Sequence, residues 1–405
     1  MIKEDFLKNY TELISSGSTP KGGSDNYLDD GEIIFIRSQN VLMNKFSDHD
    51  ALYIPLDIHE KMKRTWVKNR DVLINITGAS IGRTTVYVGE DNKANVNQHV
   101  CIIRLKDFKT IDPFYLSFFL SSNSFQKHIV KINAGATRQA LNFSQIGKFK
   151  IPIPPIETQK QIVEMIRKAE KMKEWRAEAN DLTDDYLKSV FLVMFGDPRK
   201  NPMEWPLKKA EEICLNEKNA IKAGPFGSSL KKEFYVDTGY KIYGQEQVIK
   251  DDFEYGDYYI SEERYQKLKN CKIKTGDILI SLVGTYGKIS IVPENFEPGI
   301  INPRLMKISL NQKVILPEYF KCLLLSEGMK ARIENLSHGG TMGILNVKII
   351  KQLKFPIPPI DIQKQFLELL NQLETIKNHQ FQSKQQINNL FNTLMQKAFK
   401  GELIC

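Results

Sequence analysis

One stretch of this 405-residue chain occurs twice, and this repeat limits the possible folds more than any other feature of the sequence. Residues 149–166 are FKIPIPPIETQKQIVEMI, and residues 353–370, which lie 204 positions later, are LKFPIPPIDIQKQFLELL. Ten of the 18 aligned positions are identical. The period is far longer than that of a solenoid repeat. The sequence therefore predicts two domain-sized, similar halves.

Each copy of the repeat opens a long segment that contains neither glycine nor proline. After the proline-rich connector, which disfavours helix, the first segment is Ile156–Phe195 and the second is Ile360–Lys400. Apolar residues recur at helical spacing, as at Ile162, Ile166 and Ala169. A helix of 40 residues is about 60 Å long and needs a partner helix. We expect the two helices to pack as an antiparallel coiled coil, with a pseudo-two-fold axis relating the halves.

The middle of the second segment, Lys377–Asn389, is rich in Gln, Asn and Lys. This composition is compatible with a disordered low-complexity stretch or with a solvated helix face. The apolar periodicity on both sides favours the helix.

The regions outside the long segments are predicted to be two mixed α/β globules, which makes the fold class α+β. In the first half, runs rich in β-branched residues predict strands at Ile33–Ile36, Val72–Ile76, Thr84–Val88 and Val100–Leu105. Helical spacing of apolar residues predicts one helix from Pro113 to about Val130. Scattered residues of this pattern return in order in the second half, so the same framework is expected there.

Composition sets broad limits on function. With 41% apolar and 26% charged residues, the chain is an ordinary globular protein. No secretory signal or membrane-spanning run is present in it, so a cytoplasmic protein without a membrane partner is expected. The net charge of +9 permits a nucleic-acid partner, although a lysine-rich solvated surface would give the same value. Five widely spaced cysteines without a CxxC pair indicate reduced thiols.

No catalytic motif is found in the sequence. The segments GASIGRTT (78–85) and GTYGKIS (284–290) are loosely similar to phosphate-binding loops, but their glycine spacing is wrong. They are better explained as turns between strands, with Arg83 or Lys288 at the tip. There is no GxGxxG, no NPPY-type segment and no HxxxH pair. The chain is therefore predicted to be non-catalytic, with no metal or cofactor of its own.

Polar loops in both halves remain as candidate binding sites. Their Arg, Lys, Asn, Gln and Thr side chains are the types that pair with base edges and phosphates. Any one of them could belong to an ordinary solvated loop, but their occurrence in both halves beside a shared framework favours DNA recognition. The candidates are Arg37, Gln39, Asn40, Thr77, Ser80, Arg83, Asn97, Gln98, Thr137, Arg138 and Gln139 in the first half, and Gln245, Gln247, Thr285, Tyr286, Lys288, Asn302, Arg304, His338 and Thr341 in the second.

The end of the first long segment, Val190–Phe195 (VFLVMF), is apolar on every side. Two packed helices cannot cover all of this surface, so a third surface must, either the adjacent globule or a partner subunit. The predicted partner contacts are Phe191, Met194, Phe391 and Leu394.

The chain resembles the specificity (S, HsdS-type) subunits of type I restriction–modification systems. The resemblance covers essentially the whole sequence. It is carried by the two PIPPIxxQKQ stretches and by SSGSTPKGG (15–23), FGDPRKNPMEWPL (195–207), GPFGSSLKKEFY (224–235) and LMQKAFKGEL (394–403).

The resemblance implies two target-recognition domains, residues 1–152 and 198–355, and two helical spacers, residues 153–197 and 356–405. Each recognition domain would bind one half of a bipartite, asymmetric site in double-stranded DNA. Two methyltransferase subunits, which carry S-adenosylmethionine and methylate adenine, would dock on the helices. Restriction subunits that use ATP and Mg²⁺ would complete a complex for phage defence, and the specificity subunit itself would catalyse nothing.

Three other interpretations stay open at this point. A stand-alone, pseudo-dimeric DNA-binding regulator would bind its site without methyltransferase subunits. A specificity-subunit homologue could serve another type of restriction system. A coiled-coil scaffold whose globules bind protein would show no salt-dependent affinity for DNA.

The length of the helices yields a first prediction. One turn of DNA is about 34–36 Å long, so a helix of about 60 Å can separate two half-sites. Inserting one helical turn near Glu178 should lengthen the recognised spacer and leave both half-sites unchanged. Sequencing of the methylated DNA motif measures this, and an unchanged motif would contradict the prediction.

Overall fold

The computed structural model forms two compact units, and the division between them falls within each long helix. Unit 1 comprises Met1–Ala177 and Phe381–Cys405, and unit 2 comprises Glu178–Gln380. Within the part of the chain that the structure describes, no helix is long and apolar enough to cross a membrane. The described residues are 3–132, 140–282, 287–337 and 346–403.

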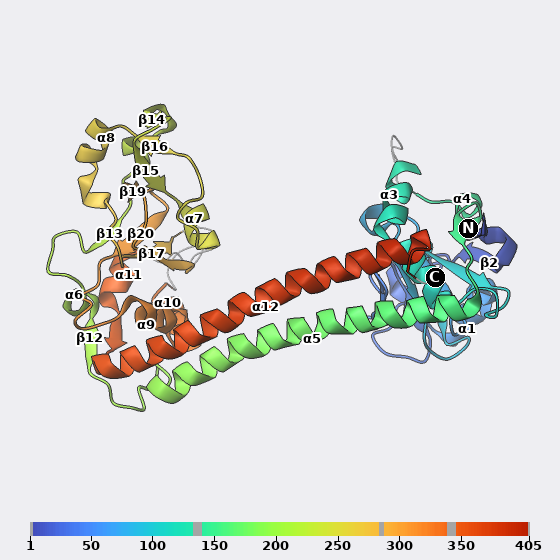
Figure 1. The fold of residues 1–405 in the computed structure, drawn as a ribbon. Coiled ribbons are helices and arrows are strands. Elements are labelled where there is room, and N and C mark those ends of the chain that lie inside the picture. The colour runs from blue at the N-terminus through green and yellow to red at the C-terminus, as the bar shows by residue number, and fades with distance from the viewer. Residues whose placement is uncertain (1–2, 133–139, 283–286, 338–345, 404–405) are drawn as a thin grey trace. The chain divides into compact units, whose positions relative to one another are not determined.

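Unit 1 consists of short strands, α-helices and 3-10 helices (η) (Figure 1). In chain order they are β1 (Glu4–Phe6), η1 (Leu7–Tyr10), β2 (Thr11–Ser16), η2 (Gly23–Asn26), β3 (Ile34–Ile36), β4 (Val41–Leu42), β5 (Lys45–Phe46), β6 (Leu52–Tyr53), α1 (Leu56–Lys61), η3 (Lys63–Thr65), β7 (Val72–Asn75), η4 (Gly78–Ser80), β8 (Thr84–Val86), β9 (Ala94–Val96), β10 (Val100–Leu105), α2 (Pro113–Ser121), α3 (Asn123–Ile132), α4 (Phe143–Gly147) and β11 (Lys150–Pro152).

The core of unit 1 lies on both faces of an antiparallel sheet with the strand order β2-β10-β7-β8. Side chains alternate between the faces of a strand. Val72 and Ile74 of β7 therefore pack with α2 and α3 on one face. Leu73 packs on the other face with residues of β3 and β9, which pair in parallel. Three of the four predicted strands, β7, β8 and β10, lie in this sheet, and the fourth is β3. Burial on both faces explains why β7 and β10 are almost continuously apolar.

The single helix expected from Pro113 to about Val130 is wrong, because the chain forms α2 and α3 with a break at Ser122. Ser122 has an extended backbone, and its hydroxyl accepts a hydrogen bond from the Phe125 N–H at 3.3 Å. A serine in this position caps a new helix. The apolar spacing continues across the break and therefore does not reveal it.

Unit 2 follows the same plan. Its elements are β12 (Leu207–Lys209), α6 (Ala210–Ile213), β13 (Ile221–Ala223), η5 (Gly227–Ser229), η6 (Lys232–Phe234), β14 (Tyr235–Val236), β15 (Tyr240–Tyr243), α7 (Gln245–Lys250), β16 (Tyr259–Ile260), α8 (Glu262–Lys267), η7 (Lys269–Cys271), β17 (Ile278–Ser281), β18 (Ile289–Ile291), β19 (Gly299–Ile301), β20 (Leu305–Ile308), α9 (Pro317–Leu325), α10 (Glu327–Ser337), α11 (Val347–Gln352) and β21 (Lys354–Pro356).

The sequence repeat is also a structural repeat. The sheet β13-β20-β17-β18 of unit 2 has the strand order and antiparallel pairing of the sheet in unit 1. The parallel pair β15–β19 corresponds to β3–β9, and the closing pair β12–β21 corresponds to β1–β11. The two mixed α/β globules with an internal repeat are therefore confirmed.

The long helices are α5 (Ile156–Phe195) and α12 (Ile360–Lys400), and α12 is helical through its Gln- and Asn-rich middle. In unit 1, Ile162 of α5 shares a cluster with Ala398 of α12, and the Lys173 ammonium lies 4.5 Å from the Phe391 ring centroid. In unit 2, Lys377 pairs with Asp184, and the Phe191 and Phe366 rings lie 5.7 Å apart. Residues later in α5 thus meet residues earlier in α12, so the helices pack antiparallel in both units.

A buried glutamine of the repeat joins each sheet to its long helix. Gln159 is fully buried; its Oε1 accepts from the Asp112 N–H at 2.9 Å, and its Nε2 donates to the Thr110 and Pro154 carbonyls. Gln363 makes the same three bonds in unit 2, to the Leu316 N–H and the Val314 and Pro358 carbonyls. One side-chain amide therefore pairs with backbone groups of both the proline connector and the loop before α2 or α9.

This clamp predicts a large loss of stability in a Gln363→Leu variant. The substitution leaves one buried N–H and two carbonyls of unit 2 without this partner, and an unsatisfied buried group costs about 1–3 kcal/mol. We expect urea denaturation, followed by circular dichroism, to show a loss of about 3 kcal/mol.

Gln365→Leu is the matched control, because Gln365 lies two residues along the same helix and is exposed. It should change the free energy of unfolding by less than about 0.5 kcal/mol. Equal losses in the two variants would contradict the clamp.

Candidate nucleic-acid interface

The candidate loops of unit 1 that the structure describes meet at one edge of its four-stranded sheet. The register pairs Cys101 with Ser16 and Val100 with Asn75, so β2 ends and β10 begins beside the end of β7. β8 begins there too, because Thr84 pairs with Ile74. Antiparallel pairing thus places the segments after β2 and β7 and before β8 and β10 next to one another. We call this edge the loop edge.

Backbone hydrogen bonds hold the loop edge together. The Asn97 N–H donates to the Ile36 carbonyl at 3.0 Å, and the Ile76 N–H donates to the His99 carbonyl at 2.9 Å. The Asn75 side-chain amide donates to the Ser38 carbonyl at 2.8 Å. These bonds attach the Arg37–Asn40 segment, which follows β3, to the same edge.

Unit 2 has a loop edge with corresponding bonds. The Asn302 N–H donates to the Tyr243 carbonyl at 2.8 Å, and the Leu282 N–H donates to the Arg304 carbonyl at 2.9 Å. The Gln245 amide donates to the Ser281 hydroxyl at 2.6 Å. Asn302 and Arg304 therefore occupy the places of Asn97 and His99 in unit 1.

A glycine packs against each loop edge where no other residue fits. A Cβ on Gly17 would lie 1.6 Å from the Val96 carbonyl oxygen, and one on Gly224 would lie 1.8 Å from that of Asn302. The loop after β2 or β13 is therefore pressed onto the turn before β10 or β20. In unit 1 this loop also carries Thr19, whose hydroxyl donates to the Gln98 side chain at 2.6 Å.

Three of the predicted base-contacting residues are buried at the loop edges. Asn40 accepts from the Arg37 N–H at 2.9 Å, and Gln247 accepts from the Gly244 N–H at 2.9 Å. Asn97 accepts from the His99 N–H at 3.0 Å. These side chains hold the loops in shape, and their contact with a base stays a prediction.

Other predicted residues present their side chains to solvent. Arg83 and Lys288 occupy equivalent places, because the Asn75 N–H donates to the Arg83 carbonyl and the Ser281 N–H donates to that of Lys288. Gln39, Gln98, Arg83, Lys288 and Arg304 are exposed, and Arg37, Thr77, Ser80, Gln245 and Asn302 are half-buried. Thr137, Arg138, Gln139, Thr285, Tyr286, His338 and Thr341 lie outside the described residues.

A buried ion pair supports each sheet at its opposite end. Arg104 contacts Asp71 at 2.8 Å, and Lys307 lies 3.6 Å from Asp277. Burial raises the pKa of Asp71 and of Asp277, while the neighbouring cation opposes that rise. Each carboxylate also accepts a backbone N–H, from Lys68 or Lys274. The pair is a repeated internal support, away from the loop edge.

Comparison with known proteins identifies the family. The family model described as the type I restriction modification DNA specificity domain matches residues 7–179 and 202–389. The chain belongs to this family. It is 24% identical, over 96% of its length and 84% of the relative, to the type I restriction enzyme EcoBI specificity subunit of Escherichia coli. It is 23% identical, over 98% and 88%, to the EcoKI specificity subunit of Escherichia coli K12.

Solved structures of type I systems share the fold. The chain matches one from a study of complex assembly and conformational transition in the type I system with a TM-score of 0.66 and 16% identity, over 99% of this chain and 98% of that chain. The chain is thus a specificity subunit of a type I restriction–modification system, the non-catalytic component. Cys101, Cys214, Cys271 and Cys322 are free thiols, and burial raises the pKa of Cys101 to about 12.

The predicted partner contacts divide between core and surface. Phe191 is only 4% exposed, because its ring packs against Phe366 and Tyr319 in unit 2. The adjacent globule therefore covers this side chain. Met194 is half-buried on the same core, and Phe391 and Leu394 are half-buried in unit 1. Their contact with a partner stays a prediction.

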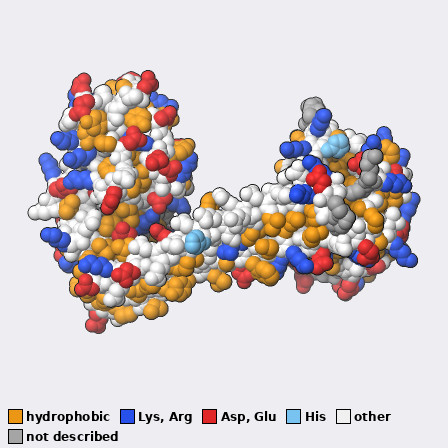
Figure 2. Space-filling model, in the orientation of Figure 1, with side chains coloured by type: hydrophobic (Ala, Val, Ile, Leu, Met, Phe, Trp, Pro, Cys, Tyr) orange, Lys and Arg blue, Asp and Glu red, His pale blue; other side chains and the backbone are white. Residues whose placement is uncertain are grey.

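The exposed part of the apolar segment is Leu192 and Val193, at 50% and 74%. Met203, in the connection after α5, and Leu207, the first residue of β12, are exposed too. Figure 2 shows hydrophobic side chains along the lower edge of this unit, where α5 ends. We call these four residues the α5-end patch.

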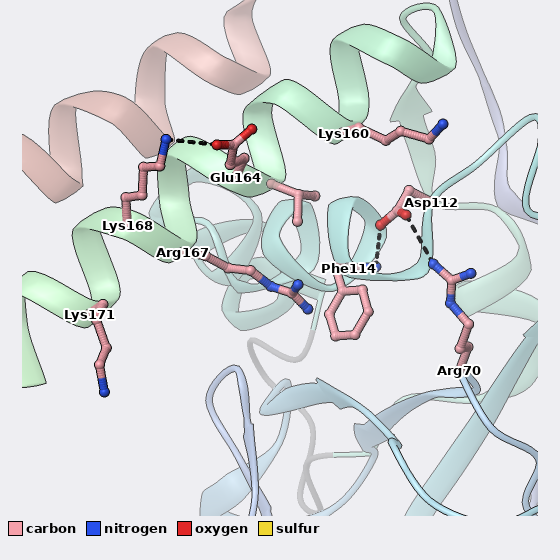
Figure 3. A pocket seen from close by; sticks show the side chains of 9 residues that line it. Arg70, Asp112, Phe114, Lys160, Glu164, Arg167, Lys168 and Lys171 are labelled. Atoms are coloured by element: carbon pink, nitrogen blue, oxygen red, sulfur yellow. Dashed lines mark hydrogen bonds and ion pairs between the residues drawn. The ribbon is translucent and has the colours of Figure 1, made fainter.

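A basic cavity of about 560 Å³ lies between α2 and α5 in unit 1 (Figure 3). The Arg167 guanidinium lies 3.9 Å from the Phe114 ring centroid, and Arg70 pairs with Asp112. Arg70 precedes β7, whereas the loop edge follows that strand. In the sequence repeat, Arg167 and Lys171 correspond to Asn371 and Thr375 of unit 2. The cavity is therefore no part of the repeated loop edge.

Proposed function

We propose that each unit binds one half of a bipartite, asymmetric site in double-stranded DNA through its loop edge. One observation carries this proposal: the two loop edges have the same backbone framework but expose different side chains. Corresponding backbone bonds hold both edges, yet Arg83 and Gln98 are exposed on one, and Lys288 and Arg304 on the other. Side chains of these types bind phosphates and base edges, and different sets suit different half-sites.

The domain limits that fit this function are residues 1–152 and 198–355 for recognition and residues 153–197 and 356–405 for the helical spacers. Two closing strand pairs support them. β11 pairs with β1 immediately before α5, and β21 pairs with β12 immediately before α12.

The proposed partners are two methyltransferase subunits and the restriction subunits of a cytoplasmic type I complex. S-adenosylmethionine for adenine methylation would be bound by the methyltransferase subunits, and ATP and Mg²⁺ by the restriction subunits. The names of the curated relatives, which are subunits of type I restriction enzymes, support this assignment. The exposed α5-end patch offers an apolar surface for such a contact.

Mapping of genomic methyladenine, with and without this gene, tests the proposal. Its expected result is a two-part motif that is methylated only when the gene is present. Methylation that does not depend on the gene would overturn the proposed function.

The two turn-tip cations predict how salt affects DNA binding. Arg83 and Lys288 are exposed, and a cation that contacts a phosphate contributes about one unit to the slope of log K against log salt. Replacing either by alanine should reduce that slope by about one without changing the preferred sequence. Fluorescence anisotropy with the methyltransferase-bound complex at several salt concentrations measures the slope.

Lys313→Ala is the matched control for Lys288→Ala. Lys313 is also exposed and belongs to unit 2, but it follows β20 at the end of the sheet opposite the loop edge. It should leave the slope unchanged. The same slope for both variants would contradict a phosphate contact at Lys288.

The α5-end patch predicts a separate effect on assembly. A carboxylate in an apolar contact is costly to desolvate, so Val193→Glu should reduce co-purification of the methyltransferase subunits by at least tenfold. Its thermal unfolding should match that of the native chain because Val193 is exposed. Val88→Glu, at a valine 67% exposed in unit 1, is the control and should assemble normally. Normal assembly of both variants would exclude the patch as the docking surface.

A further inference from the structure

An aromatic side chain projects from the loop edge of unit 2. Phe226 is 87% exposed, more than any other large apolar residue that the structure describes. It lies between β13 and η5, in the loop that Gly224 presses against Asn302. Exposing a phenylalanine forgoes about 1.5–3 kcal/mol of burial.

The exposure of Phe226 is not the result of a loose loop. On one side, the Gly224 N–H donates to the Leu305 carbonyl at 2.9 Å, and Pro225 is buried. On the other side, the Ser229 N–H donates to the Phe226 carbonyl at 2.8 Å. The backbone is fixed before and after the ring, which is therefore held outward.

The surroundings of Phe226 indicate which ligand suits it. The turn that Gly224 contacts carries the exposed Arg304, and the next turn of the loop edge carries the exposed Lys288. An aromatic ring and cations on one loop edge are complementary to nucleic acid, which presents both base faces and phosphates. A protein partner bound through hydrophobic contacts would need a wider apolar surface around the ring.

The corresponding loop of unit 1 has different chemistry. Gly17 also lies against a carbonyl of its loop edge, that of Val96, which precedes the Asn302 counterpart Asn97. Two residues further on, the chain has Thr19 where unit 2 has Phe226. The Thr19 hydroxyl is hydrogen-bonded to Gln98. Unit 1 therefore places a polar pair where unit 2 places a free aromatic ring.

We propose that Phe226 inserts its ring between bases of the half-site that unit 2 binds, while Arg304 and Lys288 contact the flanking phosphates. This inference rests on the DNA recognition proposed above. An inserted apolar wedge unstacks a base step and kinks the duplex. Unit 2 would thus select its half-site partly by how easily that step deforms.

A Phe226→Ala variant tests the insertion. The assay uses the chain assembled with its methyltransferase subunits and a duplex carrying the mapped site. Loss of a base–aromatic contact should weaken binding about 5- to 150-fold, with the salt slope unchanged because no phosphate contact is removed. Phe226→Trp, which keeps an aromatic ring, should bind within about threefold of the native complex.

A 2-aminopurine probe reports the insertion directly. Placed at successive positions of this half-site, it should brighten on binding at a step other than the methylated adenine. That signal should disappear with Phe226→Ala. Phe381→Ala is the matched control, since Phe381 is 62% exposed on α12, away from the loop edges. It should change neither affinity nor fluorescence.

Two results would overturn the insertion while leaving DNA recognition intact. One is native affinity and native fluorescence in Phe226→Ala. The other is a salt slope lowered by about one, which would assign the loop to a phosphate. A native complex that binds the mapped duplex no better than a scrambled one would overturn the proposed function itself.

Discussion

The buried glutamine amide at the start of each long helix connects the parts of this protein. A sheet, a proline connector and a helix meet at this point, and their backbone groups would be left unpaired if the amide were absent. Gln159 and Gln363 each accept one backbone N–H and donate to two carbonyls. Because a buried unpaired group is costly, this geometry strongly favours one direction of exit from each globule.

The loop edges show how a shared framework can carry different side chains. Their shape comes from backbone bonds, such as those from Asn97 to Ile36 and from Asn302 to Tyr243. Exposed side chains at such an edge can change without disturbing the sheet, because the backbone and buried side chains such as Asn40 and Asn97 make the bonds that hold the loops. Thr19 in one unit and Phe226 in the other illustrate this freedom. A duplicated chain can thus present two different sets of side chains, as the proposed recognition of an asymmetric site requires.

Sequence patterns predicted the repeat, the long helices and three of the four strands of the first sheet, β7, β8 and β10, but they missed β2. They failed at Ser122, where the apolar spacing continues although the backbone is extended. They also could not separate Phe191 from Val193, since both belong to one apolar run, and only packing against Tyr319 and Phe366 buries the first. Thr19 and Phe226 lie in two segments that carry the family resemblance, SSGSTPKGG (15–23) and GPFGSSLKKEFY (224–235). Nothing in those segments indicated which side chain is exposed.

The sequence by itself determined the duplication, the helices and the family, because periodicity and repeated motifs are local properties of the chain. Only the tertiary structure decided which polar residues hold a loop and which face solvent. Asn40 and Gln39 are neighbours of similar chemistry, yet one is buried with its amide bonded to backbone, and the other is exposed. An amide can pair equally well with a backbone group or with a base edge. The choice depends on the distance to each partner, and that distance is set when remote strands meet at the loop edge.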